Sequence, residues 1–495
     1  IPAHDLSAAS VAAATGGPRD QVAEALEELC DLNLLTTAAA GRYQFFDPLR
    51  DHASRVAADT LPGDVRGAVA GRVVRWYMDT ARAACVAAGI PVPERADRDG
   101  ADPTASFDDA ASALAWLDRE RGNLLSVLRS AESSPTPLWI LVDSIANYLL
   151  FRAEGTALLD IAGVALRQAE ALADATAQVT MLTRQSSAAQ SLGDRDAMRG
   201  FSHSARQRLT ADAPPRLRLR VLGQLIIAHR ALANVSEAAT VAAEALKVYR
   251  GLEDGEGSYI LQQAAATAFD GGDLAATREL LDEACQRFRR RDSLNLGFAL
   301  TALMEICSEM GDFDTAERLA AEVREWIDAP GPNLSLAQLH QDLAIYHHAR
   351  GETDTALGHA RQAVELLPKL GMRDVDGAAI RTLAEVGRGV DPDAARHATE
   401  AVRLSGESDA LTDHIEALRV LAQVTSATAP AERARDLARR HGYRFLEAKA
   451  LAVLTEVHRA DGDRAAARRD GAEALRLLDW CGAKPLRDHV ARLIE

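Results

Sequence analysis

The chain has 495 residues, of which 47% are hydrophobic and 4% aromatic, and its formal net charge is −16. This acidic balance disfavours nucleic-acid partners, and the absence of any apolar run of roughly 18 residues argues against a membrane span, so we expect a cytoplasmic protein. The five cysteines lie far apart, without metal-ligand spacing, at Cys30, Cys85, Cys285, Cys307 and Cys481.

The first 60 residues predict a winged-helix domain (1–60). Leu6–Ala14 and Pro18–Leu32 carry helical patterns. Two short strands are expected within 33–46, to which all strand content should be confined, and a third helix follows from about Pro48. This domain holds nine acidic residues and four arginines, so we expect no direct contact with nucleic acid.

The next 71 residues, 61–131, are expected to form connecting helices. Prolines and aspartates cluster at 91–108, where they stop any helix and predict an extended linker.

Residues 132–495 predict an array of helix pairs. Clear turn signatures lie at Gly193-Asp194, Gly272-Asp273, Gly311-Asp312, Gly351-Glu352 and Gly462-Asp463. Weaker ones lie at Gly155-Thr156, Ala233-Asn234, Val390-Asp391 and Ala429-Pro430. The mean period near 39 residues fits two helices per repeat, and therefore an all-α, TPR-like α-solenoid superhelix of eight or nine pairs.

No residue pattern indicates catalysis or a metal site. Three histidines, His229, His347 and His458, precede turns at equivalent positions, so we interpret them as packed structural side chains. The sequence has no G-x-x-x-x-G-K-[ST] motif, because none of its four lysines follows a glycine. We therefore predict a chain that is not an enzyme and carries no cofactor.

The first helix of each pair should line the concave surface of the superhelix, where ligands of such arrays bind. Residues one helical turn apart on these helices predict a groove for a protein or small-molecule effector. Its candidate residues are Arg230, Phe269, Glu305, Ser308 and His348. The two basic side chains favour an acidic or amide-bearing ligand. The alternative is that all five are ordinary solvated groove residues.

Two segments resemble a known family. Residues 25–53, ALEELCDLNLLTTAAAGRYQFFDPLRDHA, resemble the winged helix that follows the nucleotide-binding (NB-ARC) domain of STAND-class signalling ATPases. Residues 107–131 are similar to the helix that opens the TPR sensor of SARP/AfsR-like bacterial transcription regulators. The matching residues of that helix are Trp116, Leu117, Glu120, Asn123 and Leu124.

This resemblance implies the signal-sensing and autoinhibitory region of a STAND-type transcription regulator. ADP or ATP is then expected only with an upstream nucleotide-binding domain, which would be a partner of this chain. The start at Ile1 agrees with a piece of a longer protein. The alternative function is a freestanding TPR scaffold for protein–protein interaction.

The sequence departs from the family at one position. The family's His–Asp pair, whose histidine contacts ADP, is here Phe46–Asp47. A phenyl ring cannot hydrogen-bond a phosphate, so ADP-dependent autoinhibition is in doubt. In the alternative interpretation, Phe46 packs beneath the third helix.

Overall fold

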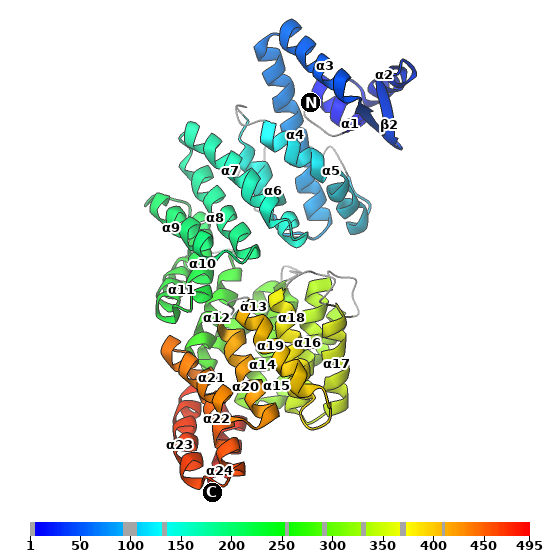
Figure 1. Cartoon of the computed structure of the whole chain (residues 1–495). Coiled ribbons are helices and arrows are strands. Elements are labelled where there is room, and N and C mark those ends of the chain that lie inside the picture. The colour runs from blue at the N-terminus through cyan, green and yellow to red at the C-terminus, as the bar shows by residue number, and fades with distance from the viewer. Residues whose placement is uncertain are drawn as a thin grey trace. The chain divides into compact units, whose positions relative to one another are not determined.

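The computed structural model describes residues 5–92, 106–130, 136–252, 257–289, 295–327, 333–366, 373–407 and 411–495. Within these residues the chain forms 24 helices and one small sheet of three strands (Figure 1). The all-helical fold class is therefore confirmed, and none of the described residues after position 110 is in a strand.

The N-terminal elements are β1 (Leu6–Ser7), α1 (Ala8–Thr15), α2 (Arg19–Asp31), β2 (Leu35–Ala39), β3 (Arg42–Phe45) and α3 (Asp47–Thr60). The sheet order is β1-β3-β2, and both pairings are antiparallel. The expectation that strands are confined to 33–46 is wrong, because β1 lies outside that range. Two helices, a hairpin and a third helix do occur in the predicted order, but the winged-helix class stays a prediction.

The first helix begins two residues later than expected because Ser7 caps it. The Ser7 backbone is extended, and its hydroxyl accepts a hydrogen bond from the Ser10 amide at 3.1 Å. The extended pair formed by Leu6 and Ser7 is therefore free to join the sheet beside Tyr43 and Arg42. Leu6 and Tyr43 then contribute to the small core of this module.

The two long helices that follow are α4 (Gly63–Ala87) and α5 (Ala110–Ser130). They pack against each other and against the next two helices, and they share one hydrophobic core with them. Most of the predicted 91–108 linker lies outside the described residues. The predicted boundaries at 60 and 131 stay predictions.

Nine helix pairs and a final helix follow. The first helices of this array are α6 (Leu138–Phe151), α7 (Gly155–Ala171), α8 (Ala175–Ser191) and α9 (Arg195–Arg208). The next helices are α10 (Pro215–Ala231), α11 (Val235–Arg250), α12 (Tyr259–Gly271), α13 (Leu274–Arg289), α14 (Asn295–Met310), α15 (Phe313–Ile327), α16 (Asn333–Ala349) and α17 (Thr353–Leu366). The last are α18 (Arg373–Val386), α19 (Ala394–Glu407), α20 (Leu411–Thr425), α21 (Thr428–His441), α22 (Arg444–Ala460), α23 (Arg464–Cys481) and α24 (Lys484–Ile494).

One residue with a positive φ lies in each turn between the two helices of a pair. These residues are Ala153, Gly193, Ala233, Gly272, Gly311, Gly351, Gly389, Ser426 and Gly462. Their spacings are 40, 40, 39, 39, 40, 38, 37 and 36 residues, so the repeat shortens gradually toward the C-terminus. The predicted turns at 155, 390 and 429 were therefore displaced by one to three residues, because alanine or serine adopts the left-handed conformation at two of them.

The residue five positions after each of these turn residues is buried at every repeat. The set is Leu158, Met198, Ala238, Thr277, Ala316, Ala356, Ala394, Ala431 and Ala467. Ala395 lies five positions after the predicted turn at Val390, and it is exposed instead. Alanine or threonine occupies seven of these nine positions, and a small buried side chain there allows the two helices of a pair to approach closely.

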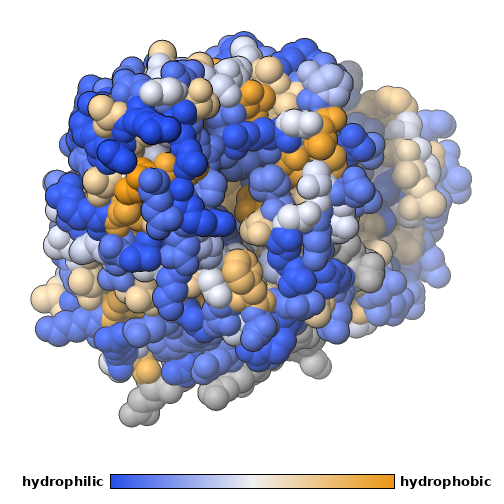
Figure 2. Space-filling view, turned by 90° about the horizontal axis from the view of Figure 1, so that it is seen from below, coloured by the Kyte–Doolittle hydropathy of each residue, from blue (hydrophilic) through white to orange (hydrophobic). Residues whose placement is uncertain are grey.

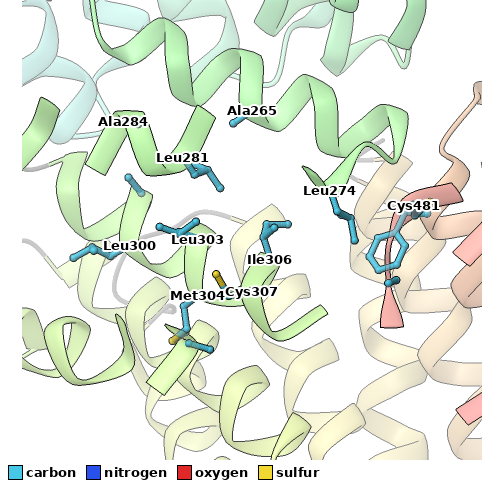
Figure 3. Close-up of a cluster of buried hydrophobic side chains, with 14 of the residues drawn as sticks. Ala265, Leu274, Leu281, Ala284, Leu300, Leu303, Met304, Ile306, Cys307 and Cys481 are labelled. Atoms are coloured by element: carbon cyan, nitrogen blue, oxygen red, sulfur yellow. The ribbon is translucent and has the colours of Figure 1, made fainter. Parts of the chain in front are cut away.

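The chain divides into two compact units, Ile1–Leu217 and Arg218–Glu495. In the second unit the array curls back on itself, so that α12 contacts α22 and α14 contacts α24 (Figure 1). A buried apolar cluster joins these helices, and Leu274 lies beside Cys481 in it (Figure 3). This closure places residues about 180 positions apart around one interior space.

Candidate functional site

The interior of the second unit holds a cavity of about 350 Å³. Its walls come from α10, α12, α14, α16, α18, α20 and α22, and each of these is the first helix of its pair. The lining side chains include Asp270, Glu309, Arg381, Glu385, Asp413, Glu416, Arg419 and Lys449. Seven successive repeats thus contribute to one site.

A second cavity of about 350 Å³ adjoins the first, because Arg230, Phe269 and Glu305 line both. Its other walls are largely apolar, with the side chains of Ala266, Leu281, Phe298, Ala302 and Ile306. We call the two spaces the charged cavity and the apolar cavity. The whole molecule seen from below has a mainly hydrophilic surface with separate apolar patches and a hollow near the middle of the view (Figure 2).

The structure brings four of the five predicted groove residues together. Arg230, Phe269, Glu305 and His348 line the charged cavity. Ser308 does not line either cavity, because its side chain is buried and its hydroxyl donates to the Met304 carbonyl at 2.9 Å.

Most charges in the charged cavity are paired. Lys449 Nζ lies 2.9 Å from Glu309 Oε1. Arg419 bridges two carboxylates, with Nη2 at 2.7 Å from Glu385 Oε1 and Nε at 2.6 Å from Glu416 Oε2. Burial opposes ionisation of Glu416, but Arg419 and Lys449 nevertheless hold its pKa well below the usual range. These pairs stiffen the cavity wall with fixed dipoles.

The predicted preference for an acidic ligand is not supported by the surroundings of Arg230. Its Nε lies 2.6 Å from Asp270 Oδ2, so its charge is neutralised within the wall. Six acidic and four basic side chains line the charged cavity, which gives a formal charge of −2 with histidine counted as neutral. The electrostatic field inside therefore favours cations.

Glu305 differs from the cavity carboxylates whose pairing with a basic side chain is described above. In the part of the chain that the structure describes, its side chain makes no hydrogen bond and no ion pair. Burial raises the pKa of Glu305 to about 7, and the nearby Lys449 ammonium lowers it only in part. The carboxylates of Asp342 and Glu309 contribute to this increase.

The sequence did not indicate Arg419 and Lys449 as site residues. They lie on α20 and α22, far from the turn-proximal positions of the earlier repeats, and reach the cavity because the array curls. The repeat period carries no signal for this curvature, so the ion pair between Lys449 and Glu309 could not be predicted from it.

A histidine cluster lies between α16 and α17. The Nδ1 atoms of His340 and His359 are 2.9 Å apart, and the His347 ring stacks on His359 with centroids 5.5 Å apart. Burial, with smaller contributions from His340 and His347, lowers the pKa of His359 to about 4. Among the described residues, no group of histidine, cysteine and carboxylate side chains is arranged to hold a metal ion. No helix in these residues is long and apolar enough to span a membrane.

Phe46 does not pack beneath the third helix, so that interpretation is wrong. It is the residue that precedes α3, and its side chain is 48% exposed. None of the residues of α3 is buried.

No protein-family model matches the chain. It is 33% identical over 181 residues to the regulatory protein AfsR of Streptomyces coelicolor, a match that covers 32% of this chain. That match spans only 18% of the length of AfsR.

Among solved structures, the chain is similar to a Rap protein complexed with competence and sporulation factor, at 11% identity and a TM-score of 0.56. That match covers 70% of this chain and 97% of the Rap chain. A STAND protein with a tetratricopeptide repeat sensor from Pyrococcus horikoshii matches with 10% identity and a TM-score of 0.43, over 99% of this chain and 63% of that one. The likeness to the Rap protein establishes a TPR-like fold, and the chain is similar to part of a bacterial regulatory protein.

Proposed function

We propose that this chain is the signal-sensing region of a STAND-type transcription regulator, and that its effector binds in the two adjoining cavities of the second unit. The observation that carries the proposal is that the first helices of seven successive pairs line one cavity. An effector there contacts many repeats at once, so its binding changes the curvature of the whole array.

The comparisons support this proposal from two directions. The sequence relative is a regulatory protein. The Rap structure, whose fold is similar, contains a bound competence and sporulation factor. We further propose that residues 1–60 are a winged-helix module and that an upstream nucleotide-binding domain is the partner which the sensor restrains.

A variant that fills the apolar cavity tests this function. Ala266 lines that cavity, so Ala266→Trp places an indole where the effector would lie. Ala395 is exposed on α19 and lines neither cavity, so Ala395→Trp is the matched control. Both variants should keep the helical circular dichroism of the parent chain.

Native mass spectrometry after incubation with a low-molecular-mass streptomycete extract provides the readout. We expect the parent chain and Ala395→Trp to retain the same ligand mass and Ala266→Trp to lose it. Retention by all three proteins, or by none, would contradict effector binding in the cavities. A freestanding scaffold would instead bind partner proteins equally well with either tryptophan.

A further inference from the structure

The Glu305 side chain lies where the two cavities meet, because it lines both. The other cavity carboxylates whose partners are described have a basic side chain within 2.9 Å, as Asp270 has Arg230 and Glu309 has Lys449. Glu305 has no such partner among the described residues. A half-buried carboxylate without a cation is costly unless a ligand supplies the charge.

The apolar cavity next to Glu305 is suited to the body of such a ligand. Phe269 and Phe298 both line it, and Phe298 is 37% exposed. Aromatic rings attract cations through their faces and pack well against aromatic or branched apolar groups. The volume of about 350 Å³ fits a small organic molecule or one to two side chains of a peptide.

We propose that the junction of the two cavities binds a primary ammonium ion attached to an aromatic or branched apolar body, with the ammonium on Glu305 and the body beside Phe269 and Phe298. This inference rests on the proposed function and names the chemistry of the effector. An amine ligand and the amino terminus of a peptide share this chemistry.

The protonation of Glu305 makes the binding pH-dependent. The charged groups around it are Arg230 on α10, Glu309 on α14, Asp342 and His348 on α16, Arg381 on α18, Glu416 on α20 and Lys449 on α22. With the pKa of Glu305 near 7, only part of the population is ionised at neutral pH. Affinity for an ammonium ion therefore increases between about pH 6 and pH 8, and binding releases a proton.

Phenethylamine is the probe, and 3-phenylpropionate is its anionic counterpart of similar size. Isothermal titration calorimetry of the full chain should detect binding of the amine and none of the acid. Glu305→Gln should weaken amine binding by about tenfold or more and abolish its pH dependence, as expected for loss of a charge-assisted hydrogen bond. Asp314→Asn, on the exposed surface of α15, should leave both unchanged.

Equal binding of the acid, full affinity in Glu305→Gln, or affinity that does not change with pH would overturn the ammonium site. Glu305→Gln removes a carboxylate that has no basic partner among the described residues, so it should not lower the melting temperature. A loss of binding in this folded variant then cannot be ascribed to unfolding. If Ala266→Trp abolishes retention of an extract ligand while phenethylamine fails to bind, the proposed function survives and only this inference falls. If the chain retains no extract ligand but binds phenethylamine through Glu305, the proposed function falls and the ammonium site remains.

Discussion

Arg42 on β3 and Glu120 on α5 are 78 positions apart in the sequence, yet their side chains form an ion pair with only 7% and 2% of their surfaces exposed. Arg42 also pairs with Asp5, and Tyr77 donates a hydrogen bond to Glu120 Oε2 at 2.9 Å. Asn123 donates to Asp5 Oδ1 at 2.8 Å. This buried network fixes the N-terminal module to the two helices that precede the repeat array.

Removal of the cation from this network should destabilise the first unit. Arg42→Met keeps the length of the side chain but removes the cation that pairs with Glu120 and Asp5, which costs about 3–5 kcal/mol of unfolding free energy. Urea unfolding followed by the fluorescence of Trp76 and Trp116 measures this loss.

The control for Arg42→Met is Arg403→Met, which breaks an exposed pair with Glu400 and should have little effect on the stability of the second unit. Adding Glu120→Gln to Arg42→Met should restore part of the lost stability, because one unpaired buried charge is removed. A loss of less than about 1 kcal/mol in Arg42→Met would show that the network does not hold the module in place.

Two glycines with the same backbone conformation test the closure of the second unit. Gly272 and Gly462 have φ values of 87° and 81°, so alanine at either position costs about 1–2 kcal/mol of conformational strain. A Cβ at Gly272 would also lie 3.1 Å from both Arg444 Cβ and Cys481 Sγ, whereas a Cβ at Gly462 meets nothing within 4 Å. Calorimetry should therefore give a lower melting temperature for Gly272→Ala than for Gly462→Ala. Equal melting temperatures would contradict the contact between α12 and the C-terminal repeats.

The histidine cluster predicts a loss of stability in mild acid. The pKa of His359 is about 4 in the folded chain and 6.5 in the unfolded reference, so the unfolded state takes up a proton first as the pH falls. The contribution of His359 to stability is therefore fully present above about pH 6.5 and decreases as the pH falls to about 4. Arg324 Nη2, 3.3 Å from His347 Nε2, adds to the positive field at the cluster.

Chemical unfolding of the second unit at a series of pH values checks this prediction. His359→Gln should flatten the dependence between these pH values, whereas His441→Gln, at the end of α21, should keep it. An unchanged slope in His359→Gln would rule out this histidine as its source.

The chain by itself should neither hydrolyse ATP nor bind ADP measurably. None of its four lysines lies in a phosphate-binding loop, and Phe46 offers no hydrogen bond to a phosphate. Calorimetry with ADP checks this, and a micromolar affinity would overturn the assignment of the chain to the sensor region.

The sequence predicted the helix pairs because glycine followed by aspartate or glutamate marks five of their nine turns. Asp194 and Asp463 each accept a hydrogen bond from the third residue of the following helix at 2.9 Å, which is the physical reason for that signature. Ala233 and Ser426 occupy left-handed positions without this signature. The turn near Ser426 was therefore misplaced by three residues.

The sequence predicted only part of the candidate groove. Arg230, Phe269 and Glu305 follow from the repeat register, because equivalent positions on successive first helices face the same interior. The pairing of Arg230 with Asp270 depends on side-chain conformation, and the approach of Lys449 to Glu309 depends on curvature. Neither pairing has a periodic signal, so the net acidic lining of the charged cavity could not be predicted from the sequence.

Hydrogen–deuterium exchange of the full chain, with and without the low-molecular-mass extract, tests the central claim most directly. If the effector binds in the two cavities, amide protection should increase in the first helices that line them, above all α12 and α14, and Ala266→Trp should abolish this change. Protection confined to the second helices such as α13 and α15, or to residues 5–60, would contradict effector binding in the interior of the second unit.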